Sequence, residues 1–479
     1  MREELSPQTL SRLSSFIGST IGLHFPPERW RELAHGMVTL GALRGFADAE
    51  DCAAWLLSSS LSREQIEMAA RQLTVGETYF FRERAGLDAV EREVLPDLIR
   101  RRRASGVRLR IWSAGCCTGE EPYSVAMMLD MMLPDLSDWN ITILATDINS
   151  RFLEIASAAE YGAWSFRSVP PGIKERYFTA TAAGRFQLAR KIRRMVTFSA
   201  LNLAEDVYPS LAGATNAMDI VLCRNVLMYF APEQAARVAS NIRAALVDGG
   251  WLLVAPCETS QTLFKGFATV NFPEAILYRK SPLPPAQPVT WAAPTPGQIR
   301  SAEPGLSLPS EEPLPGAEPV APAREPATDG PIIDAQTLAN RESSGQPASQ
   351  DELARVLANQ GELSQALALC DQAIAADGVD PAKRFLRALV AQELGMLDEA
   401  RESLERTLYL DPDFVMAHVA LGSLARRLGR PRQSRRHLQT ALSLLTRLAP
   451  DAPVAEASGL TAGRLIETIR ATVDWRDEA

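Results

Sequence analysis

Short apolar, β-branched runs alternate with helical stretches in the middle of the chain, and this alternation constrains the fold more than any other sequence feature. Runs typical of strands are 107–114, 141–147, 195–203, 218–224 and 251–256. Helical spacing follows at about 120–132, 149–158 and 232–246. We expect Gly249 and Gly250 to close the last helix. Strands that alternate with helices pack as a parallel sheet, so the sequence predicts a doubly wound α/β domain.

The regions around this sheet have other patterns. Residues 161–194 interrupt the alternation with aromatic and basic residues, which predicts an inserted subdomain rather than a crossover helix. Apolar residues from about 8 to 73 recur at helical spacing, which predicts a small helical N-terminal domain over 1–75. The α/β domain is then expected over 76–281.

A proline-rich segment divides the chain. Residues 281–349 hold 15 of the 32 prolines and show no sustained apolar periodicity. This composition indicates a semi-extended linker, which we assign to 282–346.

Glycines recur at a constant spacing after the linker. Gly361, Gly395 and Gly429 lie 34 residues apart, and a small residue follows each of them five positions later. A 34-residue period of paired helices is typical of tetratricopeptide repeats. We predict three repeats over 347–448, with a capping helix and tail over 449–479.

The composition argues against several classes of function. A net charge of −8 disfavours nucleic-acid binding, which depends on Lys and Arg. No apolar run approaches the ~20 residues that cross a bilayer, and the first residues lack a signal-peptide core, so we expect a cytoplasmic protein without direct membrane insertion. The six cysteines follow neither disulfide-framework nor zinc spacing, so we predict reduced thiols and no metal. No histidine lies between positions 36 and 417.

Polar residues and glycines stand where three predicted strands end. The first strand leads into Gly115 and Gly119, the second ends at Asp147, and the fourth ends at Arg224 and Asn225. Ligands bind at the carboxyl ends of such strands, and a carboxylate at the end of the second can accept hydrogen bonds from ribose hydroxyls. A glycine-bearing first turn alone can be purely structural. Together, the three strand ends predict a site for a nucleoside-containing cofactor.

The charge beside the first turn narrows the choice of cofactor. The dinucleotide pattern G-x-G-x-x-G is absent, and Glu120 and Glu121 follow the turn directly. These carboxylates would repel a diphosphate. They suit S-adenosylmethionine, which carries a sulfonium and an ammonium group and has no phosphate.

Five motifs carry a family resemblance. They are Thr78–Glu83 (TYFFRE), Gly119–Ser124 (GEEPYS), Asp147, Asn202–Leu203 and Cys223–Phe230 (CRNVLMYF). In this order they closely resemble the chemoreceptor glutamate methyltransferases, the CheR family, over about 1–281. The resemblance implies a class I S-adenosylmethionine methyltransferase domain with a small β-subdomain at about 161–194. A helical domain precedes it in the family, and some members also carry tetratricopeptide repeats.

The resemblance also implies functional residues. Arg82 and Tyr229 would face the transferring methyl group. The residues implied for cofactor binding are Gly76, Thr78, Arg82, Glu120, Asp147, Asn202, Leu203, Arg224 and Asn225. Arg224 has an alternative role as a cap on its strand. Gly76 stands where relatives often carry Asn, and nothing is assigned in the stretch Ala255–Glu258, where only the glutamate matches.

The implied reaction is methyl transfer to glutamate side chains in the cytoplasmic domain of a methyl-accepting chemoreceptor, in chemotaxis or a similar pathway. A glutamate carboxylate has a pKa of ~4.3 and is already a nucleophile at neutral pH, which suits a domain without histidine. Two alternatives are a nicotinamide-dependent oxidoreductase and a non-catalytic, cofactor-binding scaffold that acts through its repeats. Cofactor binding without methyl transfer would support the scaffold.

The repeats suggest a route of recruitment. The turn at 179–184 is shorter and less glycine-rich than in relatives that grip a peptide tethered to the receptor. We hypothesise that the enzyme meets its receptor without that peptide. The repeat module would bind a protein partner in its concave groove and act, through the linker, as a second attachment point.

Overall fold

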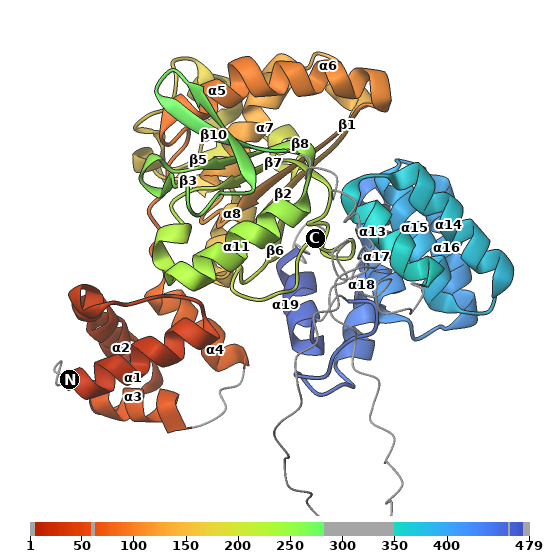
Figure 1. Cartoon of the computed structure of the whole chain (residues 1–479). Helices are drawn as coiled ribbons and strands as arrows, with labels where there is room; N and C mark the ends of the chain where they lie inside the picture. The colour runs from red at the N-terminus through yellow and green to blue at the C-terminus, as the bar shows by residue number, and fades with distance from the viewer. Residues whose placement is uncertain (1–4, 59–62, 282–348, 458–459, 473–479) are drawn as a thin grey trace, which may run out of the picture.

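The computed structural model describes residues 5–58, 63–281, 349–457 and 460–472. Three parts follow one another along the chain: a helical bundle, an α/β domain and a helical array (Figure 1). The linker assigned to 282–346 lies outside the described residues.

Four helices form the N-terminal bundle. They are α1 (Pro7–Thr20), α2 (Trp30–Arg44), α3 (Ala49–Ser58) and α4 (Arg63–Leu73). Helix α1 begins after Ser6, whose hydroxyl accepts a hydrogen bond from the Thr9 amide, and α2 ends at Gly45, whose φ is 77°. Buried side chains at helical spacing, such as Leu13 and Ile17, form the core of the bundle.

A seven-stranded sheet forms the centre of the α/β domain. Its strands are β1 (Arg108–Ala114), β2 (Asn140–Asp147), β6 (Val196–Ala200), β7 (Met218–Cys223), β8 (Leu246–Val254), β9 (Phe267–Phe272) and β10 (Ala275–Lys280). The order is β6-β2-β1-β7-β8-β10-β9. The first five are parallel, and the hairpin of β9 and β10 adds two antiparallel strands. The predicted doubly wound α/β fold is confirmed.

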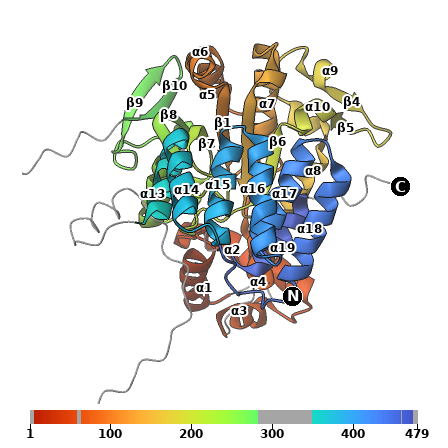
Figure 2. The same ribbon diagram turned by 90° about the vertical axis from the view of Figure 1, so that its right-hand side faces the viewer.

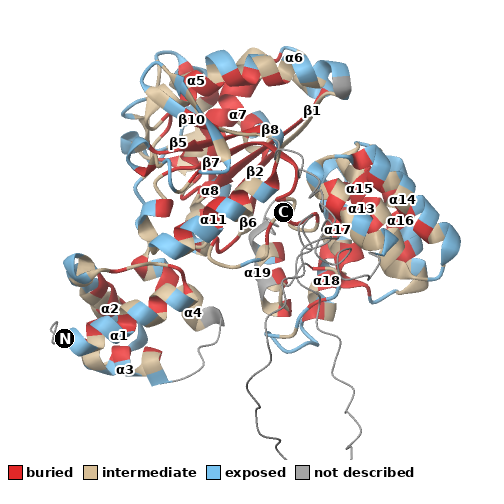
Figure 3. Ribbon diagram, in the orientation of Figure 1, coloured by how far each residue is buried: buried red, intermediate tan, exposed pale blue. Residues whose placement is uncertain are grey.

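Helices cover both faces of this sheet. They are α5 (Arg84–Ala89), η2 (Val90–Val94), α6 (Leu95–Ser105), α7 (Glu120–Met132), α8 (Ser150–Ala158) and α11 (Pro232–Ala245). Along β1, Leu109 and Ile111 enter one buried cluster, whereas Trp112 and Ala114 enter another. This alternation shows that β1 is buried on both sides, as a central parallel strand requires. Figure 3 shows the buried sheet between more exposed helices.

Two details differ from the sequence predictions. Helix α11 ends at Ala245, and the glycines expected to close it lie inside β8, where the pairing with β7 shifts register. Gly249 has a φ of 77°, a conformation that suits such an irregularity. The hairpin of β9 and β10 was not predicted, because two six-residue strands carry little periodicity.

Residues 161–194 contain most of a second, three-stranded sheet. Its strands are β3 (Glu160–Tyr161), β4 (Phe178–Ala180) and β5 (Phe186–Leu188), in the order β3-β5-β4. Its short helices are η4 (Ala163–Phe166), α9 (Ile173–Tyr177) and α10 (Arg190–Arg193). Phe80 packs against Tyr161, Phe166 and Phe178 with ring centroids 4.8 to 5.3 Å apart. These aromatic contacts join the subdomain to the segment that carries the TYFFRE motif.

Three antiparallel helix pairs and one further helix form the C-terminal array. The pairs are α13 (Gln350–Gln360) with α14 (Leu363–Ala376), α15 (Pro381–Glu393) with α16 (Leu397–Leu410), and α17 (Val415–Arg427) with α18 (Pro431–Leu445); α19 (Ala462–Thr472) follows. Gly361, Gly395 and Gly429 lie in the turns within the pairs and have φ values of 88°, 79° and 69°. The 34-residue spacing therefore reflects turns that need a left-handed residue. Figure 2 shows these helices side by side along the sheet.

Candidate functional site

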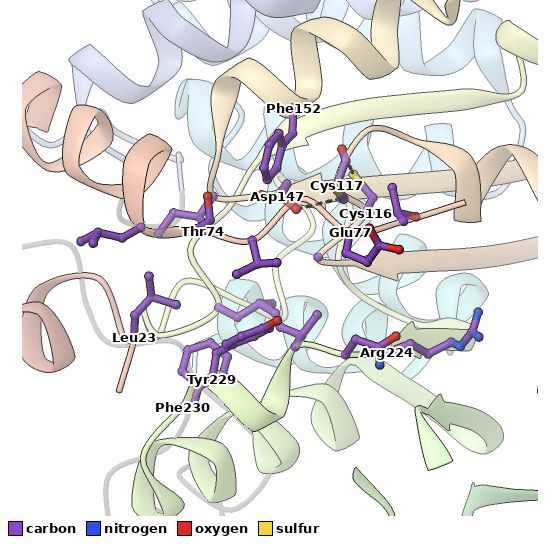
Figure 4. A pocket seen from close by; sticks show the side chains of 18 of the residues that line it. Leu23, Thr74, Glu77, Cys116, Cys117, Asp147, Phe152, Arg224, Tyr229 and Phe230 are labelled. Atoms are coloured by element: carbon purple, nitrogen blue, oxygen red, sulfur yellow. Dashed lines mark hydrogen bonds between the residues drawn. The ribbon is translucent and has the colours of Figure 1, made fainter. Parts of the chain in front are cut away.

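A pocket opens where β1, β2 and β7 end, and the N-terminal bundle forms its opposite wall (Figure 4). Together with the open solvent at its mouth, it encloses about 1010 Å³ of space. The residues that line it are Ile21, Leu23, Phe25, Arg29, Leu73, Thr74, Val75, Glu77, Thr78, Arg82, Gly115, Cys116, Cys117, Glu121, Asp147, Ile148, Phe152, Leu201, Asn202, Leu203, Arg224, Asn225, Val226, Tyr229 and Phe230.

The turn after β1 folds tightly onto the neighbouring strands. Gly115 has a φ of 79°, and a Cβ atom there would lie 2.4 Å from Val226. The amides of Gly115 and Cys116 donate to the carbonyl of Thr146 at 2.8 and 2.9 Å. Only glycine fits at this position, and its lack of a side chain leaves room for a ligand beside the backbone.

Asp147 lies at the floor of the pocket, at the end of β2. Its two carboxylate oxygens accept hydrogen bonds from the amides of Cys117 and Asn149, both at 2.8 Å. Burial raises the pKa of Asp147 to about 6, although the hydrogen bonds from these amides lower it. The carboxylate is thus fixed in place and retains lone pairs that can accept hydrogen bonds from ribose hydroxyls.

Arg224, at the end of β7, sits between two carboxylates. Its guanidinium donates to Glu121 at 3.1 Å and to Glu83 at 3.2 Å. Glu121 also accepts from the hydroxyl of Ser113 at 2.7 Å, and Glu83 accepts from the side chain of Asn225 at 3.2 Å. Arg224 therefore joins the helix after the first turn to the TYFFRE segment, which is more than a strand cap does.

Glu258 holds the loop that carries Tyr229. Its carboxylate accepts from the amides of Asn225 at 2.8 Å and Val226 at 2.7 Å, and also from those of Met228 and Ala255. Asn225 has a φ of 57°, so this loop adopts a strained backbone that needs such support. The sequence alone predicts no role for Glu258; the match of this glutamate to the family is the available signal.

The N-terminal bundle contributes residues that the sequence analysis did not predict. Leu23, Phe25 and Arg29 line the pocket. The amide of His24 donates to the carbonyl of Tyr229 at 2.7 Å, and the Arg29 guanidinium lies 5.2 Å from the centre of the Tyr229 ring. No local pattern reveals these contacts, because they depend on how two domains pack.

Seven of the nine residues implied for cofactor binding line the pocket, together with Tyr229; Gly76 and Glu120 do not. A Cβ atom at Gly76 would lie 2.8 Å from the ring of Phe152, so a larger residue would displace this part of the wall. The Glu120 carboxylate is buried and accepts from Thr118 and Ser165, which directs it toward the β-subdomain. Contact of any of these nine residues with the cofactor stays a prediction.

Comparisons with known proteins agree with this geometry. Residues 76–276 match "CheR methyltransferase, SAM binding domain", and residues 384–414 match a tetratricopeptide repeat. The chain is 30% identical to the probable biofilm formation methyltransferase WspC of Pseudomonas aeruginosa, over 79% of this chain and 86% of that protein. The chain belongs to the CheR methyltransferase family. This confirms the resemblance in the sequence and identifies S-adenosylmethionine as the cofactor.

Other members of the CheR family match the N-terminal half. Chemotaxis protein methyltransferase 1 of Pseudomonas aeruginosa is 37% identical over 44% of this chain and 77% of that protein. Chemotaxis protein methyltransferase 2 of Vibrio cholerae is 34% identical over 46% of this chain and 74% of that protein. Among the described residues, no helix is both long enough and apolar enough to cross a membrane.

The pocket fits S-adenosylmethionine. Asp147, Glu121 and Glu77 line it, and these carboxylates suit a cofactor with positive charge and ribose hydroxyls. Ile148, Phe152 and Leu203 form an apolar part of the wall.

Cofactor binding should depend on the ionisation of Asp147. Because its pKa is raised to about 6, the carboxylate is ionised above pH 6 and becomes protonated as the pH falls through 6. We expect the affinity for S-adenosylmethionine to fall over this range, and Asp147→Asn to lose roughly 1 to 3 kcal/mol of binding free energy at pH 7.5.

Calorimetry from pH 5 to 8 measures both effects. The control is Asp130→Asn, near the end of α7, which does not line the pocket. A pH response in Asp147→Asn equal to that of the wild type would contradict the assignment.

Replacing Glu258 should disorder the loop that carries Tyr229. In Glu258→Gln one carboxylate oxygen becomes an amide donor that faces amide donors, so we expect a loss of about 1 to 3 kcal/mol in the free energy of unfolding and a fall in turnover. Denaturant melts and methyl-transfer rates test this. Glu233→Gln, an exposed substitution on α11, should change neither.

Proposed function

We propose that this protein transfers the methyl group of S-adenosylmethionine to glutamate side chains of a chemoreceptor-type signalling protein. One observation carries the proposal. Arg29, Arg82 and Arg224 are the cations of the pocket wall. Arg29 pairs with Glu32 at 2.7 Å and Arg224 has two carboxylate partners, whereas the closest carboxylate of Arg82 lies 3.9 Å away. Arg82 is therefore the cation best placed to receive an acceptor carboxylate.

The chemistry of the pocket supports a carboxylate acceptor. When bound, S-adenosylmethionine supplies an electrophilic methyl group. A glutamate side chain is ionised at neutral pH and needs no base, and no histidine is among the residues that line the pocket. The protein's task is then to align acceptor and cofactor, which can be worth ~7 to 11 kcal/mol.

Arg82 and Tyr229 have separate roles in this alignment. The Arg82 guanidinium would pair with the acceptor carboxylate through charge-assisted hydrogen bonds. Tyr229 would orient the attacking oxygen through its hydroxyl. Burial raises the pKa of Tyr229, although Arg29 and Arg82 act in the opposite direction. The hydroxyl is therefore protonated at neutral pH and can donate a hydrogen bond.

The domain boundaries, the acceptor and the location of the enzyme are part of the same proposal. We propose a helical domain over 1–75, a methyltransferase domain over 76–281 and three repeats over 347–448, with the site residues given above. The acceptor is the cytoplasmic domain of a methyl-accepting chemoreceptor, and the enzyme is cytoplasmic. The chemotaxis and biofilm-formation names of the relatives favour a chemosensory pathway.

The decisive experiment is a transfer assay. Purified protein is incubated with radiolabelled S-adenosylmethionine and a receptor cytoplasmic fragment, and base-labile label on the fragment is counted. Methyl esters are hydrolysed by base, so base-labile label supports the proposed reaction. Cofactor binding without label on any receptor fragment from the same organism would instead support the non-catalytic scaffold.

Removing the guanidinium of Arg82 should damage acceptor use more than cofactor binding. We expect Arg82→Ala to lower kcat/KM for the receptor fragment by about 100-fold, the equivalent of one charge-assisted hydrogen bond. Arg84→Ala is the matched control, because Arg84 pairs with Asp88 at 2.6 Å and does not line the pocket. Equal activity of the two variants would refute this role.

The hydroxyl of Tyr229 should affect turnover alone. We expect Tyr229→Phe to lower kcat by about 10- to 100-fold, with little change in the dissociation constant of S-adenosylmethionine. Tyr79→Phe, which removes a hydroxyl outside the pocket wall, should retain wild-type kcat. Parallel losses of kcat and cofactor affinity in Tyr229→Phe would show that Tyr229 serves binding instead.

A further inference from the structure

The repeat array contacts the edge of the sheet where the parallel strands begin. A Cβ atom at Gly361, in the turn of the first repeat, would lie 3.2 Å from Val247 and 3.7 Å from Ala217, next to the starts of β8 and β7. A Cβ atom at Gly395 would lie 3.7 Å from Asn140, the first residue of β2. The turns of these two repeats thus face the amino ends of the strands.

The repeats follow the order of the strands. The first repeat lies at β7 and β8, the second at β1 and β2, and Arg427 of the third donates to the side chain of Asn140 at 3.0 Å. The contacts thus run along the strand starts in the order of the repeats, and the second and third repeats both reach Asn140 of β2.

A buried ion pair fixes this register. Glu393, the last residue of α15, accepts from Arg108 at 2.7 Å and also from Arg110, both on β1. The side chain of Arg110 is 2% exposed and that of Glu393 is 13% exposed. Burial alone would raise the pKa of Glu393, but Arg110 and Arg108 hold it below its ordinary value. Loss of one partner from such a pair leaves a buried, uncompensated charge.

Weaker contacts surround the ion pair. Arg110 also donates to the carbonyl of Ala214 at 2.6 Å, and the side chain of Asn216 donates to the carbonyl of Ala358 at 3.4 Å. Leu211, from the loop before β7, is buried within the apolar core of the repeats. This combination of a desolvated charge cluster and a buried apolar side chain is typical of a specific interface rather than of a non-specific contact.

Helix α19 completes the contact at the edge of the sheet. It packs against α18 on one side and against β6 and α8 on the other. Strand β6 is the last strand on this side of the sheet, and an open edge invites pairing with other chains. From the sequence alone, α19 is expected only to cover the last repeat.

We propose that the amino edge of the methyltransferase sheet is the permanent partner of the repeat array, and that Glu393 determines how the two fit together. The turns of the first two repeats are then unavailable to other proteins, and any further partner must use another face of the array. Because β1 runs from Arg108 at the array to Ala114 at the pocket, such a partner would be held at a fixed position opposite the cofactor site. This revises the expectation of a module that acts only through a long linker.

Cleavage of the linker tests the proposal in the full chain. A protease recognition sequence is inserted after Gly316, the protein is cut, and the two fragments are analysed by gel filtration at about 10 μM, a concentration at which a micromolar complex stays largely associated. We expect the wild-type fragments to elute together. Elution as two separate fragments would overturn the proposal.

Three substitutions define the role of the ion pair. We expect Glu393→Ala to raise the dissociation constant of the cut fragments by about 100-fold or more, which is the cost of breaking a buried pair. Arg108→Ala, on the opposite side of the interface, should act in the same direction and cannot do so by unfolding the repeats. Glu402→Ala removes an exposed partner of Arg406 on α16 and should have no effect. If Glu393→Ala and Arg108→Ala behave like Glu402→Ala, the ion pair does not determine the docking.

Hydrogen exchange of the uncut chain gives a second readout. Glu393→Ala should speed amide exchange in α19 and at the first residues of β1 and β2, while exchange in α7 stays as in the wild type. Unchanged exchange in α19 and at these strand starts would contradict the proposal.

Discussion

The parallel pairing of β1 with β2 and β7 brings the functional groups of this protein together, because the carboxyl ends of parallel strands all lie at one edge of the sheet. Gly115, Asp147 and Arg224 follow or end three neighbouring strands, and all three line one pocket. The same pairing brings the strand starts together at the opposite edge, where the repeats dock. One sheet thus supports a cofactor site and a protein interface about one strand length apart.

Charge is distributed in the pocket so that Arg29 and Arg224 have close carboxylate partners and Arg82 does not. Arg224 is buried between Glu121 and Glu83, and it organises the wall rather than the acceptor. Arg82 carries only a distant carboxylate and is partly exposed. Glu258 adds a further structural carboxylate, which accepts hydrogen bonds from four backbone amides and so holds the loop of Tyr229. In a domain without histidine, fixed geometry of this kind is what catalysis requires.

The N-terminal bundle and the repeats reach the α/β domain from different sides. The bundle closes the pocket through Leu23, Phe25 and Arg29. The hydrogen bond from the His24 amide to the Tyr229 carbonyl connects the bundle to the acceptor side of the site. The repeats contact residues near the strand starts, and α19 packs against the edge strand β6 and helix α8. Substitutions in the bundle should therefore alter the pocket itself. A partner bound to the repeats would instead act by being held at a fixed position relative to the pocket.

The sequence by itself determined the parts that rest on local periodicity and contiguous motifs. Alternating strands and helices specified the doubly wound sheet, because each run must bury its own apolar face. The 34-residue glycine spacing specified helix pairs, because each turn needs a left-handed residue. The five motifs, in their order along the chain, specified the family and its cofactor. Only the tertiary structure decided what lies across these elements: the four amides gathered on Glu258, the bundle residues in the pocket wall, and the pairing of Glu393 with Arg108 and Arg110. These contacts join residues up to 285 positions apart, and their energies depend on burial that no local stretch of sequence encodes.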